Sequence, residues 1–486
     1  MSAIHSNKSS CTSCAPNFSY HKPIEVDVAQ TSFTEDIVRP TTGLNNTKYE
    51  FELEPKGDSF LNLSSIYMIC KVQVLTDTGG VLKSAYQGNE ANIVETGRKA
   101  GATQAQKAAM EGIRKIDLVY PVPNFLGSLW KSVGVKINDI DLNPENNDNY
   151  PYKAYLEVLT TYTQDNEHLR AAGFLPATTR KGTDADVVAS HSAFKSLEKL
   201  KTNAKHDALY ERAKMVANSA VVELAGLLSH DVFHSDNHLA PGNKLTISVV
   251  RAPTKFVLTS PTDKDYQLKI LDVAIHAKRI HLDRSAVGKV MRPLAIQRYI
   301  APYTRLMAFH VNKDQRCYST PLFTNEKLPR HVLVCMVETD HYMGQHNADP
   351  YHLYHFGCNK IHLTKNGRRV SKTPLTPNYA SYKYAFSREY YRLYAETGLA
   401  NGMIDMEDYG EFHNVYPFDL SPDKCNLLHT HLGEHGSLDL DLGFLFPLEK
   451  NITVLVLASF VQVFTIDPRT GKPSTDLLPL DEWSSK

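Results

Sequence analysis

Two adjacent runs decide the fold class of this chain: Gly436-Ser437-Leu438-Asp439-Leu440-Asp441-Leu442-Gly443-Phe444-Leu445-Phe446 and Ile452-Thr453-Val454-Leu455-Val456-Leu457-Ala458-Ser459-Phe460-Val461-Gln462-Val463-Phe464. The first run alternates with period two, which places five apolar side chains on one strand face: Leu438, Leu440, Leu442, Phe444 and Phe446. The second run is apolar on nearly both faces. The short polar connection 447–451 predicts that the two strands pair as a hairpin ending a β-sandwich. No catalytic motif accompanies these strands, which favours a building block over an enzyme.

The overall composition is that of a neutral globular protein. The chain has 486 residues, enough for two or three domains, and 42% of them are hydrophobic. Lys plus Arg and Asp plus Glu both number 53, so the net charge gives no sign of a nucleic-acid ligand. A neutral chain lacks the self-repulsion that keeps copies apart, which is compatible with association. The 25 Tyr residues fit either packing on strands or protein interfaces.

Cysteine usage and the chain start bear on the compartment. The 7 Cys residues are odd in number, and the polar segment 1–10 has no apolar core of a secretory leader. We therefore expect synthesis in a reducing compartment. The longest apolar run, 452–464, is too short for a bilayer span. The expectation is a soluble protein or one attached to a particle.

The first half of the chain is predicted to be β-rich with two long insertions. Residues 1–23 are polar and irregular and predict a mobile N-terminal arm. The segments 76–115 and 163–212 interrupt the strand pattern and are predicted to be insertions. Strands are expected at 48–54, 60–75, 221–228 and 244–258, and helical segments at 104–113, 123–130 and 150–159. In the last helix Pro151 suits the first position, and one stripe is apolar: Tyr152, Tyr155, Leu156 and Leu159.

The turn-forming cluster 259–263 is the predicted boundary between two halves. Residues 24–258 are then the first unit, 263–467 the second and 468–486 a C-terminal tail. The run 266–277 is expected to open the second series of strands, followed by strands near 303–312, 331–338, 351–363, 412–419, 436–446 and 452–466. About eight strands in each half, without regular crossover helices, predict two antiparallel β-sandwiches. The strand pattern alone leaves their topology open.

Metal ligation is the weakest of the chemical signals. Cys11 and Cys14 have the spacing of half a zinc knuckle, but no suitable second pair follows except His5 and His21. A dense histidine segment consists of His341, His346, His352, His355 and His362. His352 and His355 would share a face only on a helix, so the strand prediction favours loop or surface histidines. No metal and no cofactor are predicted.

Carboxylates and a basic turn are the remaining candidates. Asp439 and Asp441 share a strand face, and with Asp419 they resemble a carboxylate set for glycoside hydrolysis. The strand alternation instead favours a solvated face opposite Leu438 and its neighbours. The run 365–369 is a basic hairpin turn with Asn-Gly at its centre, which could touch a nucleic acid or a neighbouring acidic loop. No phosphate-cradling glycine loop and no Gly-x-Ser-x-Gly elbow are present.

Six segments, in order, carry a family resemblance: Gln30-Thr31-Ser32, Asn124-Phe125-Leu126-Gly127-Ser128-Leu129-Trp130, Tyr150-Pro151-Tyr152-Lys153-Ala154-Tyr155-Leu156-Glu157, Leu328-Pro329-Arg330-His331-Val332-Leu333-Val334, Phe418-Asp419-Leu420-Ser421-Pro422-Asp423 and Gly436-Ser437-Leu438. Together the segments resemble the major capsid protein, or hexon, of Polinton/Maverick elements and adintoviruses, over residues 24–467. The resemblance implies an all-β double jelly roll, two eight-stranded sandwiches with short helices and long loop insertions. It also implies homotrimers of six barrels that tile an icosahedral shell around double-stranded DNA.

The same resemblance implies partners and a location. The expected partners are further copies of the chain and, at the vertices, penton and minor capsid proteins. The expected location is the virion, after synthesis in the host cytoplasm, with assembly possible in the nucleus. A Tyr-rich segment is the candidate trimer interface, together with the insertion 76–115: Tyr379, Tyr382, Tyr384, Tyr390, Tyr391 and Tyr394.

The arm and two other functions complete the hypotheses. Before residue 25 the arm has only Lys8 and Lys22 as cations, so shell formation is predicted to be largely independent of DNA. A carbohydrate-binding or glycoside-cleaving jelly-roll protein that uses Asp419, Asp439 and Asp441 is the alternative from another class. A capsid gene domesticated by its host is a further alternative.

Overall fold

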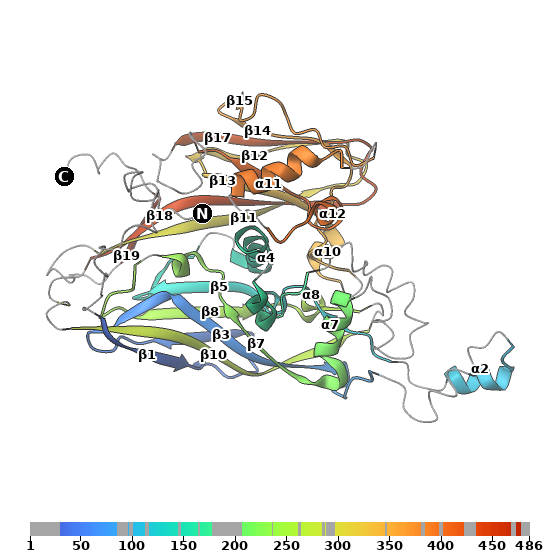
Figure 1. The fold of residues 1–486 in the computed structure, drawn as a ribbon, viewed down its shortest axis with the longest axis horizontal. Helices are drawn as coiled ribbons and strands as arrows, with labels where there is room; N and C mark the ends of the chain where they lie inside the picture. The colour runs from blue at the N-terminus through green and yellow to red at the C-terminus, as the bar shows by residue number, and fades with distance from the viewer. Residues whose placement is uncertain are drawn as a thin grey trace, which may run out of the picture.

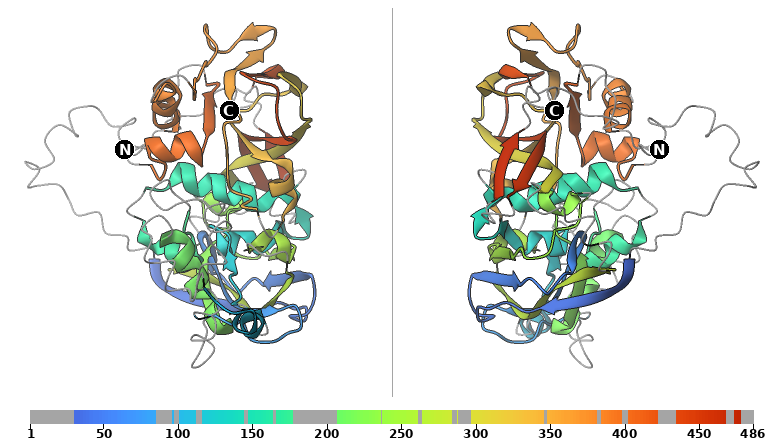
Figure 2. Two further views of the ribbon diagram at one scale, coloured as in Figure 1. Left: turned by 90° about the vertical axis from the view of Figure 1, so that its right-hand side faces the viewer. Right: turned by 90° about the vertical axis from the view of Figure 1, so that its left-hand side faces the viewer.

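The computed structural model of this chain describes residues 30–84, 96, 101–111, 116–143, 147–163, 166–176, 207–235, 237–260, 264–283, 287, 297–345, 348–380, 384–397, 402–421, 434–467 and 473–477. These residues form two β-sandwiches, one above the other in Figure 1, with helix α4 (Tyr150–Thr161) between them (Figure 2). All strand pairs between the named strands are antiparallel. The predicted all-β class is confirmed.

The first sandwich consists of two four-stranded sheets. Its outer sheet, which faces away from the second sandwich, has the order β1 (Gln30–Val38), β10 (Tyr266–Leu282), β3 (Phe60–Thr76), β7 (Val221–Leu227). Its inner sheet has the order β2 (Lys48–Leu53), β8 (Leu245–Arg251), β5 (Trp130–Ile137), β6 (Ile140–Asp141). A separate two-stranded ladder joins β4 (Tyr120–Pro121) to β9 (Leu258–Thr259).

The second sandwich also has an inner and an outer sheet. The inner one, which we call the junction sheet, has the order β11 (Gln297–Val311), β18 (Ile452–Ile466), β13 (His331–Glu338), β16 (Val415–Asp419), and β19 (Pro473–Leu477) pairs with β18. The outer one has the order β12 (Cys317–Lys327), β17 (His435–Phe444), β14 (Cys358–Lys365), β15 (Arg368–Arg369). The predicted hairpin turn joins β14 to β15, where Asn366 and Gly367 both have the positive φ that a type I′ turn requires.

The helices are short and lie around the sheets. The α-helices other than α4 are α2 (Gln104–Glu111), α3 (Phe125–Ser128), α7 (Asp207–Met215), α8 (Thr254–Val257), α10 (Thr339–Met343), α11 (Ser387–Thr397) and α12 (Met406–Glu411). The 3-10 helices are η4 (Asn147–Asn149), η5 (Glu167–Ala172), η9 (Ala217–Ser219) and η10 (Asp231–His234). None of the helices within the described ranges is long and apolar enough to cross a membrane.

The predicted hairpin of the two C-terminal runs is wrong. β17 pairs with β12 and β14 in the outer sheet, whereas β18 pairs with β11 and β13 in the junction sheet. The connection 445–451 therefore crosses from one sheet to the other. Alternation fixes which face of a strand is buried but not which strand lies beside it. Phe446 lies beyond the end of β17 and is 70% exposed, so its expected place on the buried face is also wrong.

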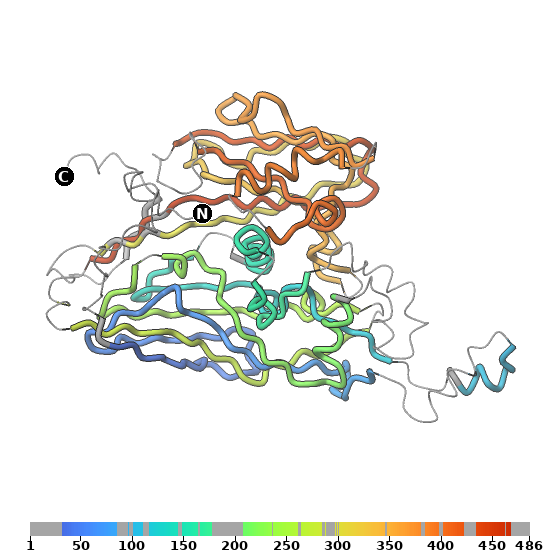
Figure 3. Tube along the Cα trace, viewed as in Figure 1, coloured from blue at the N-terminus to red at the C-terminus, as the bar shows by residue number. Residues whose placement is uncertain are grey.

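The predicted boundary at 259–263 needs one correction. The run 266–277 lies in β10, which pairs with β1 on one side and β3 on the other, so it completes the first sandwich and does not open the second. Figure 3 shows the yellow-green β10 running beside the blue strands at the bottom of the molecule. The chain passes from β8 in the inner sheet, through β9, to β10 in the outer sheet of the same sandwich. The remainder of the predicted domain division stays a prediction.

Candidate functional site at the junction of the two sandwiches

A third hydrophobic core lies between the two sandwiches. Each sandwich has a core of its own, and a separate cluster joins α4 to the junction sheet and the loops beside it. β18 contributes to two of these cores: Val454 and Val456 face the interior of the second sandwich, while Leu455 and Leu457 face the junction. This double burial explains why the sequence of β18 is apolar on both faces.

The two longest strands of the junction sheet also reach into the first core. Tyr299 of β11 and Phe464 of β18 belong to the core of the first sandwich, and their rings stack with centroids 4.6 Å apart. The Tyr299 hydroxyl accepts a hydrogen bond from the Ala240 amide at 3.1 Å. The same two strands therefore hold both halves, which fixes their relative position.

α4 presents apolar side chains to both sandwiches. Tyr150 and Ala154 pack into the first core, and the predicted stripe of Tyr152, Tyr155, Leu156 and Leu159 packs into the junction core. Pro151 occupies the start of the helix as predicted. Because a helix that is apolar on most sides must be covered on most sides, α4 is stable only between two packed bodies.

Aromatic side chains from distant segments meet around Tyr155. Its ring stacks on Tyr351 with centroids 4.1 Å apart, and its hydroxyl is 2.6 Å from Nε2 of His413. The Tyr351 hydroxyl is in turn 2.5 Å from the Ser128 hydroxyl of α3. Burial, followed by the charge of His352, lowers the pKa of His413 to about 3, so this imidazole is neutral at physiological pH.

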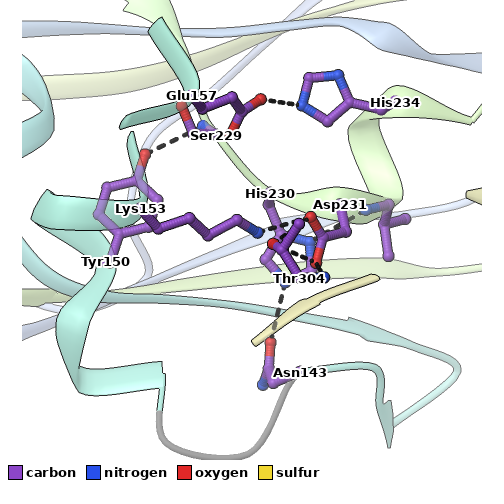
Figure 4. A network of polar contacts seen from close by, with 10 residues as sticks. Asn143, Tyr150, Lys153, Glu157, Ser229, His230, Asp231, His234 and Thr304 are labelled. Carbon is purple, nitrogen blue, oxygen red and sulfur yellow. Dashed lines mark hydrogen bonds and ion pairs between the residues drawn. The ribbon is translucent and has the colours of Figure 1, made fainter. Parts of the chain in front are cut away.

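A buried ion pair joins α4, η10 and β11 across the junction (Figure 4). Nζ of Lys153 lies 2.7 Å from Oδ1 of Asp231, and both side chains are 6% exposed. Thr304 of β11 donates its amide to Oδ2 of Asp231 at 2.8 Å and its hydroxyl to Oδ1 at 2.9 Å. Burial alone would raise the pKa of Asp231, but the Lys153 charge and these hydrogen bonds hold that pKa below its usual value.

His230 sits next to this pair and is neutral. Its Nδ1 accepts the Val232 amide at 3.3 Å, which leaves Nε2 to donate to Oδ1 of Asn143 at 3.2 Å. Burial, with the Lys153 charge second, lowers the pKa of His230 to about 3. Protonation would put a further cation beside Lys153 in a buried space, so the junction favours the neutral ring.

A more exposed pair borders the network. Nε2 of His234 is 2.5 Å from Oε1 of Glu157 on α4. Burial would lower the pKa of His234, but the hydrogen bond and charge of Glu157 outweigh it, and the pKa is raised. Between them the two pairs attach one side of α4 to η10 at successive turns of the helix.

The network fixes the positions of α4, η10 and β11 relative to one another. Lys153, Asp231, Thr304 and His230 each bond to one another, to Asn143 or to the backbone. A buried ion pair contributes little net stability, but it penalises any arrangement that separates its partners. The junction can therefore specify one orientation of the two sandwiches.

Most of the predicted interface tyrosines pack inside the chain. Tyr379 stacks on His355 and is bonded to Tyr416 and Asn414, while Tyr390 contacts Tyr394 and Tyr409. The Tyr384 hydroxyl donates to Glu407 at 3.1 Å. Tyr391 is 72% exposed, and Tyr382 lies outside the described residues. Among the tyrosines of this segment that the structure describes, Tyr391 is the most exposed, and the predicted interface stays a prediction.

The three predicted carboxylates do not form one site. Asp419 ends β16 in the junction sheet and accepts from the amide and hydroxyl of Ser421. Asp439 and Asp441 lie on β17 in the other sheet, and Oδ2 of Asp441 is 3.1 Å from Nε2 of His362. Two carboxylates on one sheet and a third on another do not flank a common substrate position.

The predicted histidine segment is dispersed in the same way. His341 and His352 lie near each other, His355 stacks on Tyr379 and His362 is on the outer sheet, while His346, Cys11 and Cys14 fall outside the described residues. Within the described ranges, no group of three His, Cys, Asp or Glu side chains could hold a metal. A pocket of about 420 Å³ beside His341, His352 and His355 has its imidazoles bonded to the backbone.

Sequence reasoning missed the polar members of the junction. Lys153, Asp231 and Thr304 are far apart in the chain, and no motif relates them. One signal was present: Lys153 is the only charged residue in the first turns of an otherwise apolar helix, between Tyr152 and Tyr155. A charge at such a position indicates a buried partner.

Comparisons with known proteins bear on the fold. No family model matches the chain. An uncharacterized protein of Caenorhabditis elegans is 22% identical over 434 residues, covering 86% of this chain and 91% of that protein. A chain of the Sputnik virophage structure superposes with a TM-score of 0.60 at 10% identity, covering 95% of this chain and 91% of that chain.

Two major capsid proteins superpose over similar lengths. The mavirus protein has a TM-score of 0.52 at 11% identity and covers 96% of both chains. The Faustovirus protein has a TM-score of 0.52 at 9% identity, covering 92% of this chain and 91% of its own. This chain is a double jelly roll. The resemblance found in the sequence is thus confirmed for the fold, and its assignment to Polinton/Maverick elements and adintoviruses stays a prediction.

Proposed function

We propose that this double jelly roll is a major capsid protein with a structural and not an enzymatic role. The observation that carries the proposal is the junction: two sandwiches of similar size are locked side by side by a shared core, two shared strands and a buried ion pair. A shell needs a building block whose two halves keep one orientation. The match with capsid proteins over nearly the whole chain supports the same role.

The proposed assembly is a homotrimer. Three copies of a two-barrel chain form a ring of six barrels, which is a pseudo-hexagonal block suited to tiling the facets of an icosahedral shell. Equal numbers of cations and anions, 53 of each, allow copies to pack without strong repulsion. The proposal includes a double-stranded DNA genome of the Polinton or adintovirus type, penton and minor capsid proteins as partners, and the virion as the location.

The test is the mass of the purified full chain by light scattering, with negative-stain imaging of the same sample. We expect a species three times the 54.5 kDa chain and hexagonal blocks or shells. Shells formed without added DNA are the expected outcome for an arm with few cations. A chain that stays a 54.5 kDa monomer at all concentrations would contradict the proposal.

Tyr391 of α11 is the contact of the Tyr-rich segment that we propose to test first, because its side chain is exposed. The Tyr391→Ala change removes an exposed ring, so the fold is expected to be unaffected while the trimer mass decreases at low concentration. Tyr390→Ala is the matched comparison, because Tyr390 packs on Tyr409 inside the chain and its loss acts on folding. An unchanged trimer in Tyr391→Ala would remove this residue from the interface.

A further inference from the structure

The exposed apolar side chains of this protein are concentrated on one sheet face. Of the large hydrophobic residues that are exposed in the described part of the chain, several project from the outer sheet of the first sandwich: Phe33, Ile37, Val221, Leu227 and Leu271. Antiparallel sheets that face water normally carry polar residues on that side. A cluster of exposed apolar residues on one face indicates a binding surface.

The strand register places two of these residues, Ile37 and Leu227, at the two ends of one row across the sheet. Ile37 of β1 is opposite His276 of β10, which is opposite Tyr67 of β3, which is opposite Leu227 of β7. The next row contains Ala274, Ile69 and Ala225. We call these two rows the apolar strip. Residues directly opposite one another share a face, so the strip crosses the sheet from edge to edge. Ile37 and Leu227 lie at the ends of its first row, and the centre of that row is formed by the stacked rings of Tyr67 and His276, both of which are bonded to Glu35.

Charged residues flank the strip on both sides. On one side Glu35 is opposite Lys278. On the other, Asp272 is opposite Lys71, and Nζ of Lys71 is 3.1 Å from Oε2 of Glu223. Each flank thus carries both signs. An apolar centre with a polar, charged rim is the anatomy of a protein interface.

The outer sheet of the second sandwich does not share this pattern. There the same geometric position is occupied by polar side chains: Ser319, Lys360, His362, Thr364, Asp439 and Asp441. The two outer sheets come from one chain and face the same solvent, so general surface composition does not explain the strip. The difference is specific to the first sandwich.

We infer that the apolar strip is a contact surface for a second copy of this chain within the proposed trimer. The side of the first sandwich toward its own second sandwich is covered by α4 and the junction sheet, and the strip lies on the opposite side (Figures 1 and 2). The balanced charges of the flanks suit a neutral partner, and a copy of this chain has zero formal charge. In a closed ring of three, the strip meets a different surface of the next copy.

The test places charges in the strip. The double variant Ile37→Lys/Leu227→Lys puts one lysine at each end of a single row of exposed side chains. Met343→Lys is the control, because Met343 is equally apolar and 69% exposed but lies on α10. A milder variant, Ile37→Ser/Leu227→Ser, covers the case in which lysines impair folding, and far-UV circular dichroism checks the fold of each protein.

This inference rests on the proposed function, and the outcomes separate the two. We expect the strip variants to raise the trimer dissociation constant by at least about ten-fold while Met343→Lys leaves it unchanged. Folded strip variants that stay trimeric like the wild type would overturn the inference and leave the capsid proposal intact. An equal loss in Met343→Lys would also overturn it. A monomeric wild-type protein would overturn both.

Discussion

The two sides of the first sandwich differ in whether their apolar and charged side chains are buried or exposed. On the side of the second sandwich, the chain buries an apolar core together with the ion pair of Lys153 and Asp231. On the other side, the apolar strip stays open and its charges lie on the flanks, as Lys71 and Glu223 do, with side chains 45% and 57% exposed. The ion pair on the covered side is buried and the ion pair on the open side is exposed to solvent, which distinguishes an interface completed by folding from one available to another molecule.

The largest expected effect comes from breaking the buried pair. Asp231→Ala leaves the Lys153 ammonium buried without its carboxylate and is expected to lower the free energy of unfolding by about 3–5 kcal/mol. Glu223→Ala, which removes the exposed partner of Lys71, should change it by less than about 0.5 kcal/mol. Urea unfolding measures both. An equal decrease in the free energy of unfolding of the two variants would refute the distinction between the covered side of the first sandwich and its exposed side.

Cavity formation in the junction sheet is the next test. Leu455→Ala removes a fully buried side chain of β18 from the junction core and should cost about 2–5 kcal/mol. Ile37→Ala truncates an exposed residue of the strip and should cost less than about 0.5 kcal/mol at protein concentrations where the chain is monomeric. Thermal unfolding at several concentrations separates the two effects. A Leu455 loss that vanished on dilution would place that residue in an intermolecular contact.

The effect that is smallest at mildly acidic pH, within one unit below 6.5, concerns the protonation of His230. The pKa of His230 is lowered to about 3 in the folded state, whereas its ordinary value is 6.5. Between these two pH values the unfolded chain therefore binds a proton at His230 that the folded chain does not bind. Its contribution to stability is therefore lost as the pH falls from 6.5 towards 3, by about 1.4 kcal/mol per pH unit. His230→Gln should reduce the slope of unfolding free energy against pH by that amount. An unchanged slope would show that His230 titrates normally in the fold.

The local sequence pattern predicted the positions of individual strands and helices well, but it predicted poorly which strands pair with each other. The alternation from Leu438 to Phe444 located β17 and its buried face, and Pro151 with its apolar stripe located α4. The same reasoning paired β17 with β18, although a sheet change separates them. A short connection such as 445–451 can close a hairpin or cross a sandwich, and the difference lies in the partners available on each sheet.

The candidate site was predictable only on its apolar side. Tyr152, Tyr155, Leu156 and Leu159 follow from helical periodicity, which is a local property. The meeting of Lys153 with Asp231 and Thr304 depends on how η10 and β11 are brought to α4 by the surrounding sheets. No spacing rule links such positions.

The sequence by itself determined that this chain is all-β, which faces of β17 and β18 are buried, and where α4 begins, because periodicity and proline geometry act over a few residues. Only the tertiary structure decided that β10 belongs to the first sandwich, that the carboxylates of β16 and β17 lie on different sheets, and that Ile37 and Leu227 lie at the two ends of one row. Those outcomes depend on strand register between segments far apart in the chain, and a two-residue repeat carries no record of its partner.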